Sequence, residues 1–432
     1  MTRFSALTLA GASLGLIATI TVQAQQTVGP PGGGQGAGRG RGQPITLPDG
    51  EAKPFVEAAC VACHQLNMIT GSAGSTREGW RDLVRTMVLL PEKQLDTVAD
   101  YLATNFPEKP GRRPTLVPGN VKITFKEWLV PTLGQRPRDP LQLGDGTIYW
   151  AGMFASLVGR LNPATGEMRE FKLPENARPH SILNDAAGNI WYTGNGNGTI
   201  GRLDPRTGDI KVYPMPDPAA RDPHTPIFDK KGQLWFTVQQ SNMVGRLNPS
   251  TGEIKLVTMP TPRSLPYGIV INSQGVPWVA CNGSNRLASL DPVTMEVREY
   301  PTPTPASRIR RLDVMSDDRL AYVDSARGYI AIMDPKTGTI KEWPSPSGPA
   351  SHPYAIAVID DVIWYNESNQ RPDALVRFDP KTEKFQSWAI PSGVGIIRHM
   401  RVTPERNLVI HQSSSNRVGL VIIDKTSRGS ER

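Results

Sequence analysis

Five consecutive residues, Cys60-Val61-Ala62-Cys63-His64, form the most specific chemical motif of the chain. The C-x-x-C-H spacing is typical of c-type haem attachment, in which both thiols form thioethers with the haem vinyl groups and the adjacent histidine binds the iron. A zinc site would need two more ligands nearby, and a thioredoxin-like redox pair would lie in a βαβ pattern. The surrounding sequence shows neither, so we predict one haem c held by Cys60, Cys63 and His64.

The second axial ligand of the iron is predicted by elimination. Of the six histidines only His64 lies near the motif, which leaves the thioethers of Met68 and Met87. In a continuous helix, Met68 would lie on the same face as His64 and could not reach the opposite side of the porphyrin. We therefore predict Met87 and keep Met68 as the alternative. A methionine at helical spacing is more often a core residue, but Met/His ligation raises the haem potential, which suits an electron acceptor.

Two helices are expected around these ligands. A helix over 76–88 follows the capping residues Ser75 and Thr76, and a second over 91–106 begins at Pro91. Residues 51–107 resemble a compact class I cytochrome c: helix, C-x-x-C-H, helix, methionine and a closing helix with the stretch Tyr101-Leu102-Ala103. So small a domain lacks a sufficient core of its own. The resemblance implies that a covalent haem completes this core and that the domain transfers electrons.

The N-terminus predicts export. Arg3 precedes an uncharged stretch over 4–22, and Val22-Gln23-Ala24 is a small-x-small cleavage site. Residues 1–24 are thus predicted to be a signal peptide and the protein periplasmic, with an uncleaved membrane anchor as the alternative. No other long apolar run follows, so we expect no integral membrane segment after cleavage. Glycine- and proline-rich residues 25–50, and residues 108–119, are predicted linkers. A nucleic-acid-binding arm fits an exported protein poorly, so no nucleic acid partner is expected.

Composition limits the fold of the remainder. The chain has 432 residues with 41 Gly, 40 Pro and three Cys, a hydrophobic share of 38% and a net charge of +8. Frequent turns and a substantial core are therefore expected, and a disulfide scaffold is excluded.

Residues 120–432 repeat a strand that ends in Asp or Asn, usually followed by Pro-x-Thr-Gly. A period of short strands and turns near 40–50 residues predicts a β-propeller. An outer strand ending in Pro follows six of the repeats, whereas a seventh copy, residues 125–131, precedes the first. We therefore predict α + all-β architecture: a helical domain and seven blades, closed by the N-terminal outer strand. The repeats are anchored at Asn162, Asp204, Asn248, Asp291, Asp334, Asp379 and Asp424.

The motifs Trp-Phe-Thr (235–237), Gly-Arg-Leu-Asn/Asp-Pro-x-Thr-Gly (159–166, 201–208, 245–252) and Pro-Tyr-Gly-Ile (266–269) resemble the streptogramin B (virginiamycin B) lyase family. The resemblance covers about 118–424. It implies the propeller fold and, for the family's activity, a catalytic histidine paired in one blade with a glutamate that binds Mg²⁺.

Two sets of channel residues are expected. The first, the inner ring, starts the innermost strands: Arg138, His180, His224, Tyr267, Arg310, Tyr354 and Arg398. The second ends the next strands and is expected to point inward too: Gly152, Gly194, Val238, Cys281, Asp324, Glu367 and Gln412. The cationic ring and Glu367 are the predicted substrate site, suited to an anionic or carbonyl-bearing ligand. The alternative is that these side chains only satisfy one another and structural water. Cys281 is expected to be a small buried hydrophobe.

The family's catalytic pairing is absent from the sequence. The blades of His180 and His224 carry Gly194 and Val238, Glu367 is paired with Tyr354, and no Glu-x-His occurs. An electron-transfer protein or haem-linked oxidoreductase is therefore favoured, with the propeller binding a small-molecule substrate or a redox partner protein. The alternatives are a lyase-like C–O lyase with an accessory cytochrome, and a non-catalytic propeller scaffold that docks another periplasmic redox protein.

Overall fold

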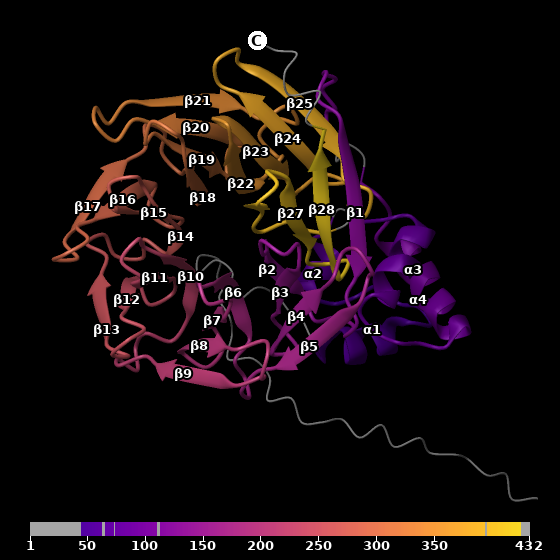
Figure 1. Ribbon diagram of the computed structural model, residues 1–432. Coiled ribbons are helices and arrows are strands. Elements are labelled where there is room, and N and C mark those ends of the chain that lie inside the picture. The colour runs from indigo at the N-terminus through magenta and orange to yellow at the C-terminus, as the bar shows by residue number, and fades with distance from the viewer. Residues whose placement is uncertain (1–44, 63–64, 73, 110–112, 394, 425–432) are drawn as a thin grey trace, which may run out of the picture. The chain divides into compact units, whose positions relative to one another are not determined.

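The structure, a computed structural model, describes residues 45–62, 65–72, 74–109, 113–393 and 395–424 (Figure 1). The predicted signal peptide, most of the first linker, and the motif residues Cys63 and His64 lie outside the described residues. No helix in the described ranges is long and apolar enough to cross a membrane.

A small helical module comes first. Its core gathers Val56, Trp80, Leu95 and Leu102, and the indole Nε1 of Trp80 donates to the carbonyl of Phe106 at 2.9 Å. The elements are α1 (Lys53–Ala59), the 3₁₀ turn η1 (Cys60–Ala62), α2 (Asn67–Thr70), α3 (Arg77–Arg85) and α4 (Glu92–Asn105).

The helix boundaries follow the capping residues. Thr76 is the N-cap of α3, and its hydroxyl accepts a hydrogen bond from the Gly79 N–H at 3.1 Å. Pro91 precedes α4. Both helices are slightly shorter than expected, so Met87 follows α3 rather than ending it.

The packed module begins before Glu51. Leu47 is 1% exposed within the helical core, and the Tyr101 hydroxyl donates to the Pro48 carbonyl at 2.6 Å. The last residues of the predicted 25–50 linker therefore belong to the module, because Leu47 adds apolar surface to a very small core. The second predicted linker, 108–119, also ends in contacts: Val117 N–H donates to the Ser387 hydroxyl at 2.8 Å.

Seven four-stranded antiparallel sheets form the propeller, with one strand of each nearest the centre (Figure 1). The innermost strands are β2 (Pro137–Gln142), β6 (Pro179–Asn184), β10 (Pro223–Phe228), β14 (Pro266–Ile271), β18 (Ile309–Val314), β22 (Pro353–Ile359) and β26 (Arg401–Val402). The second strands are β3 (Ile148–Gly152), β7 (Ile190–Gly194), β11 (Leu234–Val238), β15 (Pro277–Cys281), β19 (Leu320–Asp324), β23 (Val362–Glu367) and β27 (Leu408–Gln412).

The outer half of each sheet has two further strands. The third strands are β4 (Leu157–Leu161), β8 (Thr199–Leu203), β12 (Met243–Leu247), β16 (Arg286–Leu290), β20 (Tyr329–Met333), β24 (Ala374–Asp379) and β28 (Arg417–Ile423). The outer strands are β5 (Met168–Lys172), β9 (Ile210–Pro214), β13 (Ile254–Thr258), β17 (Val297–Pro301), β21 (Ile340–Pro344), β25 (Lys384–Ala389) and β1 (Ile123–Leu129).

One sheet combines both ends of the propeller sequence. β1 is antiparallel to β28 from the pair Ile123–Ile423 to the pair Leu129–Arg417. The sheet order is β1-β28-β27-β26, so the outer strand of the last blade comes from the start of the repeat region. This pairing covers a sheet edge of β28 that would otherwise present unpaired backbone groups.

The repeated Gly-Arg-Leu motif has a packing role. A Cβ atom added to Gly159 would lie 2.0 Å from the Trp150 ring, and one added to Gly245 would lie 2.2 Å from the Phe236 ring. Each glycine faces an aromatic residue across the sheet. The bare backbone thus makes room for a fully buried ring between blades.

Candidate functional site

The inner-ring residues occupy equivalent places on the innermost strands. In the first six blades the ring residue is the second residue of its strand, and five of these follow a proline. Just beyond this place the pairing with the second strand shifts, as between Pro179 and Ile182 in β6. A β-bulge of this kind re-aims side chains, and it recurs in the first six blades. In the seventh blade the ring residue Arg398 precedes the short strand β26.

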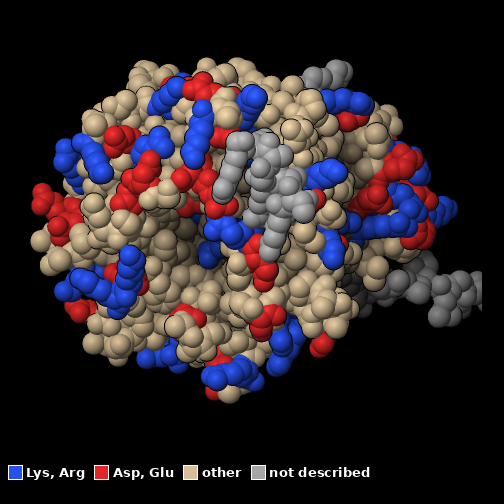
Figure 2. Space-filling view, turned by 45° about the horizontal axis from the view of Figure 1, so that its top comes forward, with Lys and Arg blue, Asp and Glu red and all other residues tan. Residues whose placement is uncertain are grey.

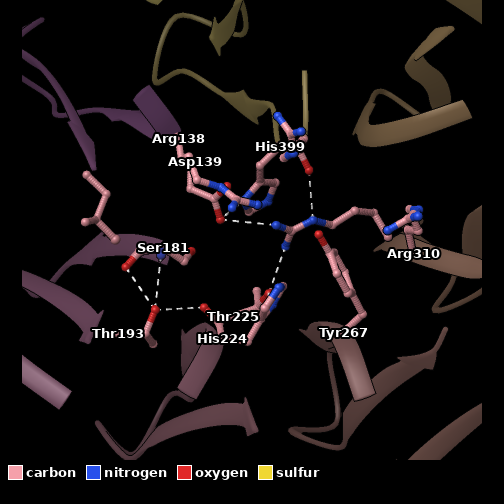
Figure 3. A network of polar contacts seen from close by, with 12 residues as sticks. Arg138, Asp139, Ser181, Thr193, His224, Thr225, Tyr267, Arg310 and His399 are labelled. Carbon is pink, nitrogen blue, oxygen red and sulfur yellow. Dashed lines mark hydrogen bonds and ion pairs between the residues drawn. The ribbon is translucent and has the colours of Figure 1, made fainter. Parts of the chain in front are cut away.

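The structure brings the inner ring together. The imidazole centroids of His180 and His224 are 3.5 Å apart, and the His224 and Tyr267 centroids are 4.2 Å apart. The Arg310 Cζ lies 4.6 Å from the Tyr354 ring centroid, and the Arg398 Cζ lies 6.0 Å from it. Figure 3 shows several of these side chains converging from different blades.

Threonines on the second strands fix the ring backbone. The Thr193 hydroxyl accepts from the Ser181 N–H at 3.1 Å and donates to the His224 carbonyl of the next blade at 2.8 Å (Figure 3). Thr237 likewise donates to the Tyr267 carbonyl at 2.8 Å. Each such hydroxyl joins two neighbouring innermost strands, so consecutive ring residues are held at a fixed separation.

The hydroxyl groups of the ring residues Tyr267 and Tyr354 share a hydrogen bond. Arg310 Nη1 donates to the Tyr354 hydroxyl at 3.4 Å. Burial alone would raise the pKa of Tyr354, but Arg310, Arg398 and Arg138 lower it to about 7. Burial and the neighbouring Tyr354 raise the pKa of Tyr267 to about 12. The pair is therefore asymmetric: Tyr267 keeps its proton, and Tyr354 titrates near neutral pH.

Both ring histidines are neutral. Burial, and then the charge of Arg138, hold the pKa of His180 well below its usual range, and burial with Arg311 does the same for His224. The two imidazoles, which pack against each other, therefore form an uncharged part of the ring beside its arginines.

Sequence reasoning missed a second layer of polar residues, one position further along the innermost strands. Asp139 is completely buried, and its Oδ2 accepts from Arg311 Nη2 and lies near His399 Nδ1, each at 3.1 Å (Figure 3). Burial would raise the pKa of Asp139, but Arg311 and His399 hold it well below its usual range. Asp139 directly follows the ring residue Arg138 on β2 and belongs to neither of the two predicted channel sets.

Arg311 spans this layer. Its Nε donates to the Arg398 carbonyl and its Nη1 to the Thr225 hydroxyl, both at 3.1 Å. The equivalent residue on β14 is Gly268, where an added Cβ would lie 2.8 Å from the Arg310 carbonyl. The doubled polar pairs Arg138-Asp139, Arg310-Arg311 and Arg398-His399 were the sequence signal for this network.

The second predicted channel set does not share the face of the ring. Pro353 pairs directly with Glu367, and Pro179 with Gly194, whereas Arg138 pairs with Ala151. Directly paired residues project from the same face of a sheet, so this set lies on the face of the prolines. The predicted register was off by one residue, which exchanges the two faces.

The contacts of the second set also place it on the face of the prolines, away from the inner ring. The Glu367 carboxylate is fully buried and accepts from the Ser345 hydroxyl at 2.6 Å and the Ser347 N–H at 2.9 Å. The Asp324 carboxylate accepts from the Arg308 N–H at 2.9 Å. Cys281 lies in an apolar cluster between blades, and burial raises the pKa of its thiol to about 12. Glu367 therefore belongs to loop packing, outside the ring.

The predicted haem ligands are only partly described. Cys60 is half-buried on η1, directly after α1, and Met87 is half-buried after α3. Met68 is 39% exposed on α2, but Gln65 and Leu66 precede that helix and are not helical. The continuous helix assumed from His64 to Met68 is therefore not seen over these residues, so the choice of Met87 stays a prediction. No group of three or more His, Cys, Asp or Glu side chains in the described ranges could hold a metal.

Several apolar side chains of the helical module are exposed. Val61 is 46% exposed and Leu89 is 88% exposed, and Met68 and Val88 are also exposed. So much uncovered apolar surface on a module of this size fits a site that a flat, mostly apolar group would cover.

Surface charge does not form a comparable site on the face shown in Figure 2. There Lys and Arg side chains are interspersed with Asp and Glu. In the ring network the Arg–carboxylate ion pair joins Arg311 to Asp139, and no carboxylate in the described part of the chain forms an ion pair with Arg138, Arg310 or Arg398.

Comparisons with known proteins agree with the fold. The sequence profile of the virginiamycin B lyase family matches residues 123–290. The crystal structure of selenomethionine-substituted virginiamycin B lyase from Staphylococcus aureus has a TM-score of 0.63 at 22% identity, covering 70% of this chain and 99% of that one. A streptogramin B lyase structure has a TM-score of 0.64 at 22% identity, covering 70% and 98%. No curated protein sequence gives a significant match. The chain thus contains a virginiamycin B lyase-like seven-bladed β-propeller, which follows a small helical module.

Proposed function

We propose that this protein is an exported c-type cytochrome–propeller fusion, which binds one covalent haem and transfers electrons. The C-x-x-C-H spacing of residues 60–64 carries the proposal. The half-buried Cys60 on a tight turn at the end of α1, and the exposed apolar side chains of the module, support it. The propeller would bind a small-molecule substrate or a redox partner protein.

Four residues would hold the haem: Cys60 and Cys63 through thioethers, and His64 and Met87 as axial ligands. A bound haem supplies one-electron chemistry, and thioether ligation by methionine raises its potential. The protein itself would position the haem ligands and shield the haem from water. The core around Trp80 and Leu95 fixes α1 and α3, which precede Cys60 and Met87. The exposed side chains of Val61 and Leu89 would supply apolar surface that excludes water.

The lyase alternative lacks a supporting observation in the site. A Mg²⁺-assisted elimination needs a base beside a carboxylate that is available to the metal. The candidate carboxylate, Glu367, is already occupied by Ser345 and Ser347, and the ring position of its blade is Tyr354. We therefore place electron transfer first.

A haem-reduction screen tests the proposal. The protein is matured with a cytochrome c assembly system, oxidised, and mixed separately with candidate small reductants and with periplasmic dehydrogenases, while the haem absorbance is followed. We expect haem reduction by at least one of these classes, and which class succeeds separates an oxidoreductase from a scaffold that docks a redox protein.

The control is the Cys60→Ser/Cys63→Ser variant, which should show no haem signal. Linear streptogramin product formed with Mg²⁺ by both proteins, without haem reduction in the native one, would contradict the proposal and support the lyase.

A further inference from the structure

The inner ring contains three arginines whose charge is not matched by a carboxylate. Arg138 and Arg398 are 4% and 5% exposed, and Arg310 is half-buried. The one carboxylate of the network, Asp139, is already bound by Arg311. Asp373 lies within electrostatic reach of Arg398 but pairs with Arg371 at 3.3 Å. Buried charges are normally paired, so this excess calls for an anion.

Individual atoms of the ring lack partners as well. Arg138 Nε, Arg398 Nη1 and His180 Nδ1 are buried without a hydrogen-bond partner in the described structure. A buried N–H without an acceptor destabilises the folded state, and the cost is greater when the group is charged. Arg138 Nη1 contacts only the weak acceptor Met153 Sδ, at 3.1 Å. The donors are thus in place, and the acceptor is what the ring lacks.

We propose that the inner ring is a binding site for the carboxylate group of a small organic acid, held by Arg138 and Arg398. The planar guanidinium fork matches a planar carboxylate and satisfies both oxygens. The uncharged rings of His180, His224 and Tyr267, packed against one another, complete the ring and add no charge that would repel an organic acid. Arg311 and Asp139 occupy the next layer of the channel. This inference deepens the proposed small-molecule role of the propeller and rests on it, but not on the haem.

Tyr354 makes the binding pH-dependent. The phenolate of Tyr354 competes with a bound carboxylate for the same positive field, so binding should draw a proton onto Tyr354. Affinity should then fall as the pH rises through about 7, the pKa of Tyr354 in the free protein. The titratable and charged groups that face Tyr354 are Arg136, Arg138, Tyr267, Arg308, Arg310, His352 and Arg398.

Calorimetric titration of the full mature chain tests the site, with acetate as the probe, acetamide as its neutral counterpart and phosphate as a competing anion. Buffers of different ionisation enthalpy report the proton uptake. We expect acetate to bind with proton uptake, acetamide not to bind, and phosphate to bind more weakly than acetate. The variants Arg138→Met and Arg398→Met should each weaken acetate binding about tenfold or more. Tyr354→Phe should bind acetate without proton uptake.

The matched control is Arg206→Met, an arginine on an exposed turn whose side chain is 76% exposed, which should bind acetate as the native chain does. Because Arg138 and Arg398 are unpaired, their replacement by Met should leave thermal stability unchanged or higher, so lost binding will not reflect unfolding. Absence of acetate binding, binding that both ring variants retain, or tighter binding of phosphate would overturn the inference. Haem reduction in the same preparation is read separately, so failure here leaves the electron-transfer proposal standing.

Discussion

The helical module and the propeller channel assemble their chemistry in opposite ways. The module has its predicted reactive groups within five consecutive residues of the sequence, 60–64. The channel joins residues from all seven blades: Asp139 and His399 meet at 3.1 Å although they are 260 residues apart in sequence. In the module a covalent group would complete a core that the chain alone leaves small. In the channel the repeated strand register supplies the whole arrangement.

Ion pairs show the same contrast. On the module, Arg81 and Asp96 pair at 2.6 Å with side chains 24% and 40% exposed. In the channel, Arg311 and Asp139 pair at 3.1 Å with side chains 3% and 0% exposed. Water and salt screen the first pair, whereas loss of one partner from the second leaves a buried charge uncompensated.

The largest expected effect follows from that contrast. Asp139→Asn should lower the free energy of unfolding of the propeller by about 3–5 kcal/mol, because Arg311 is left buried without its counter-charge. Asp96→Asn is the matched control on the module and should cause only a small loss. Denaturant unfolding measures both. Equal losses of unfolding free energy in the two variants would show that the buried channel pair and the exposed module pair contribute alike to stability.

A smaller loss of stability, confined to the helical module, is expected when its buried Leu47 is truncated. Leu47→Ala should destabilise it by about 2–3 kcal/mol through loss of buried apolar volume. Hydrogen exchange should become faster in α1 and α4 and stay unchanged in the propeller strands. Unchanged exchange in α4 would show that the packed module begins after Leu47.

The second axial ligand of the haem iron is predicted to be Met87 rather than Met68, and substitution of each methionine distinguishes the two. Met87→Leu should abolish the weak far-red absorbance of methionine-ligated ferric haem, while Met68→Leu should retain it. Covalent attachment should survive in both variants, since neither residue forms a thioether. Loss of the band in Met68→Leu instead would reassign the ligand.

The smallest effect at neutral pH is expected from Tyr354, whose contribution to stability depends on pH. The pKa of Tyr354 is lowered in the folded state from its usual 10 to about 7. The native chain should therefore gain stability relative to Tyr354→Phe as the pH rises from about 7 to about 10, and lose that advantage below about 7. Thermal unfolding across this range measures the difference. Parallel pH profiles of the two proteins would show that Tyr354 does not ionise in the folded channel.

How much could be predicted differs between the regions. The repeat spacing predicted seven blades, and counting back from the aromatic strand positions identified ring residues such as His180 and Tyr267. The same counting failed for Glu367, because a register error of one residue exchanges the faces of a strand. Asp139 escaped notice because β-bulges turn the residue after the ring position into the channel, and bulges have no sequence signature of their own. The module's helices were predictable from Thr76 and Pro91, whereas the packing of Leu47 depends on tertiary contacts.

The covalent haem proposed for the module can be detected in the mass of the mature chain produced with cytochrome c assembly, measured before and after extraction with acidified organic solvent. We expect the polypeptide mass plus one haem in both samples, and the bare polypeptide mass for Cys60→Ser/Cys63→Ser. A native chain that shows the bare mass, or that loses its haem on extraction, would rule out covalent attachment.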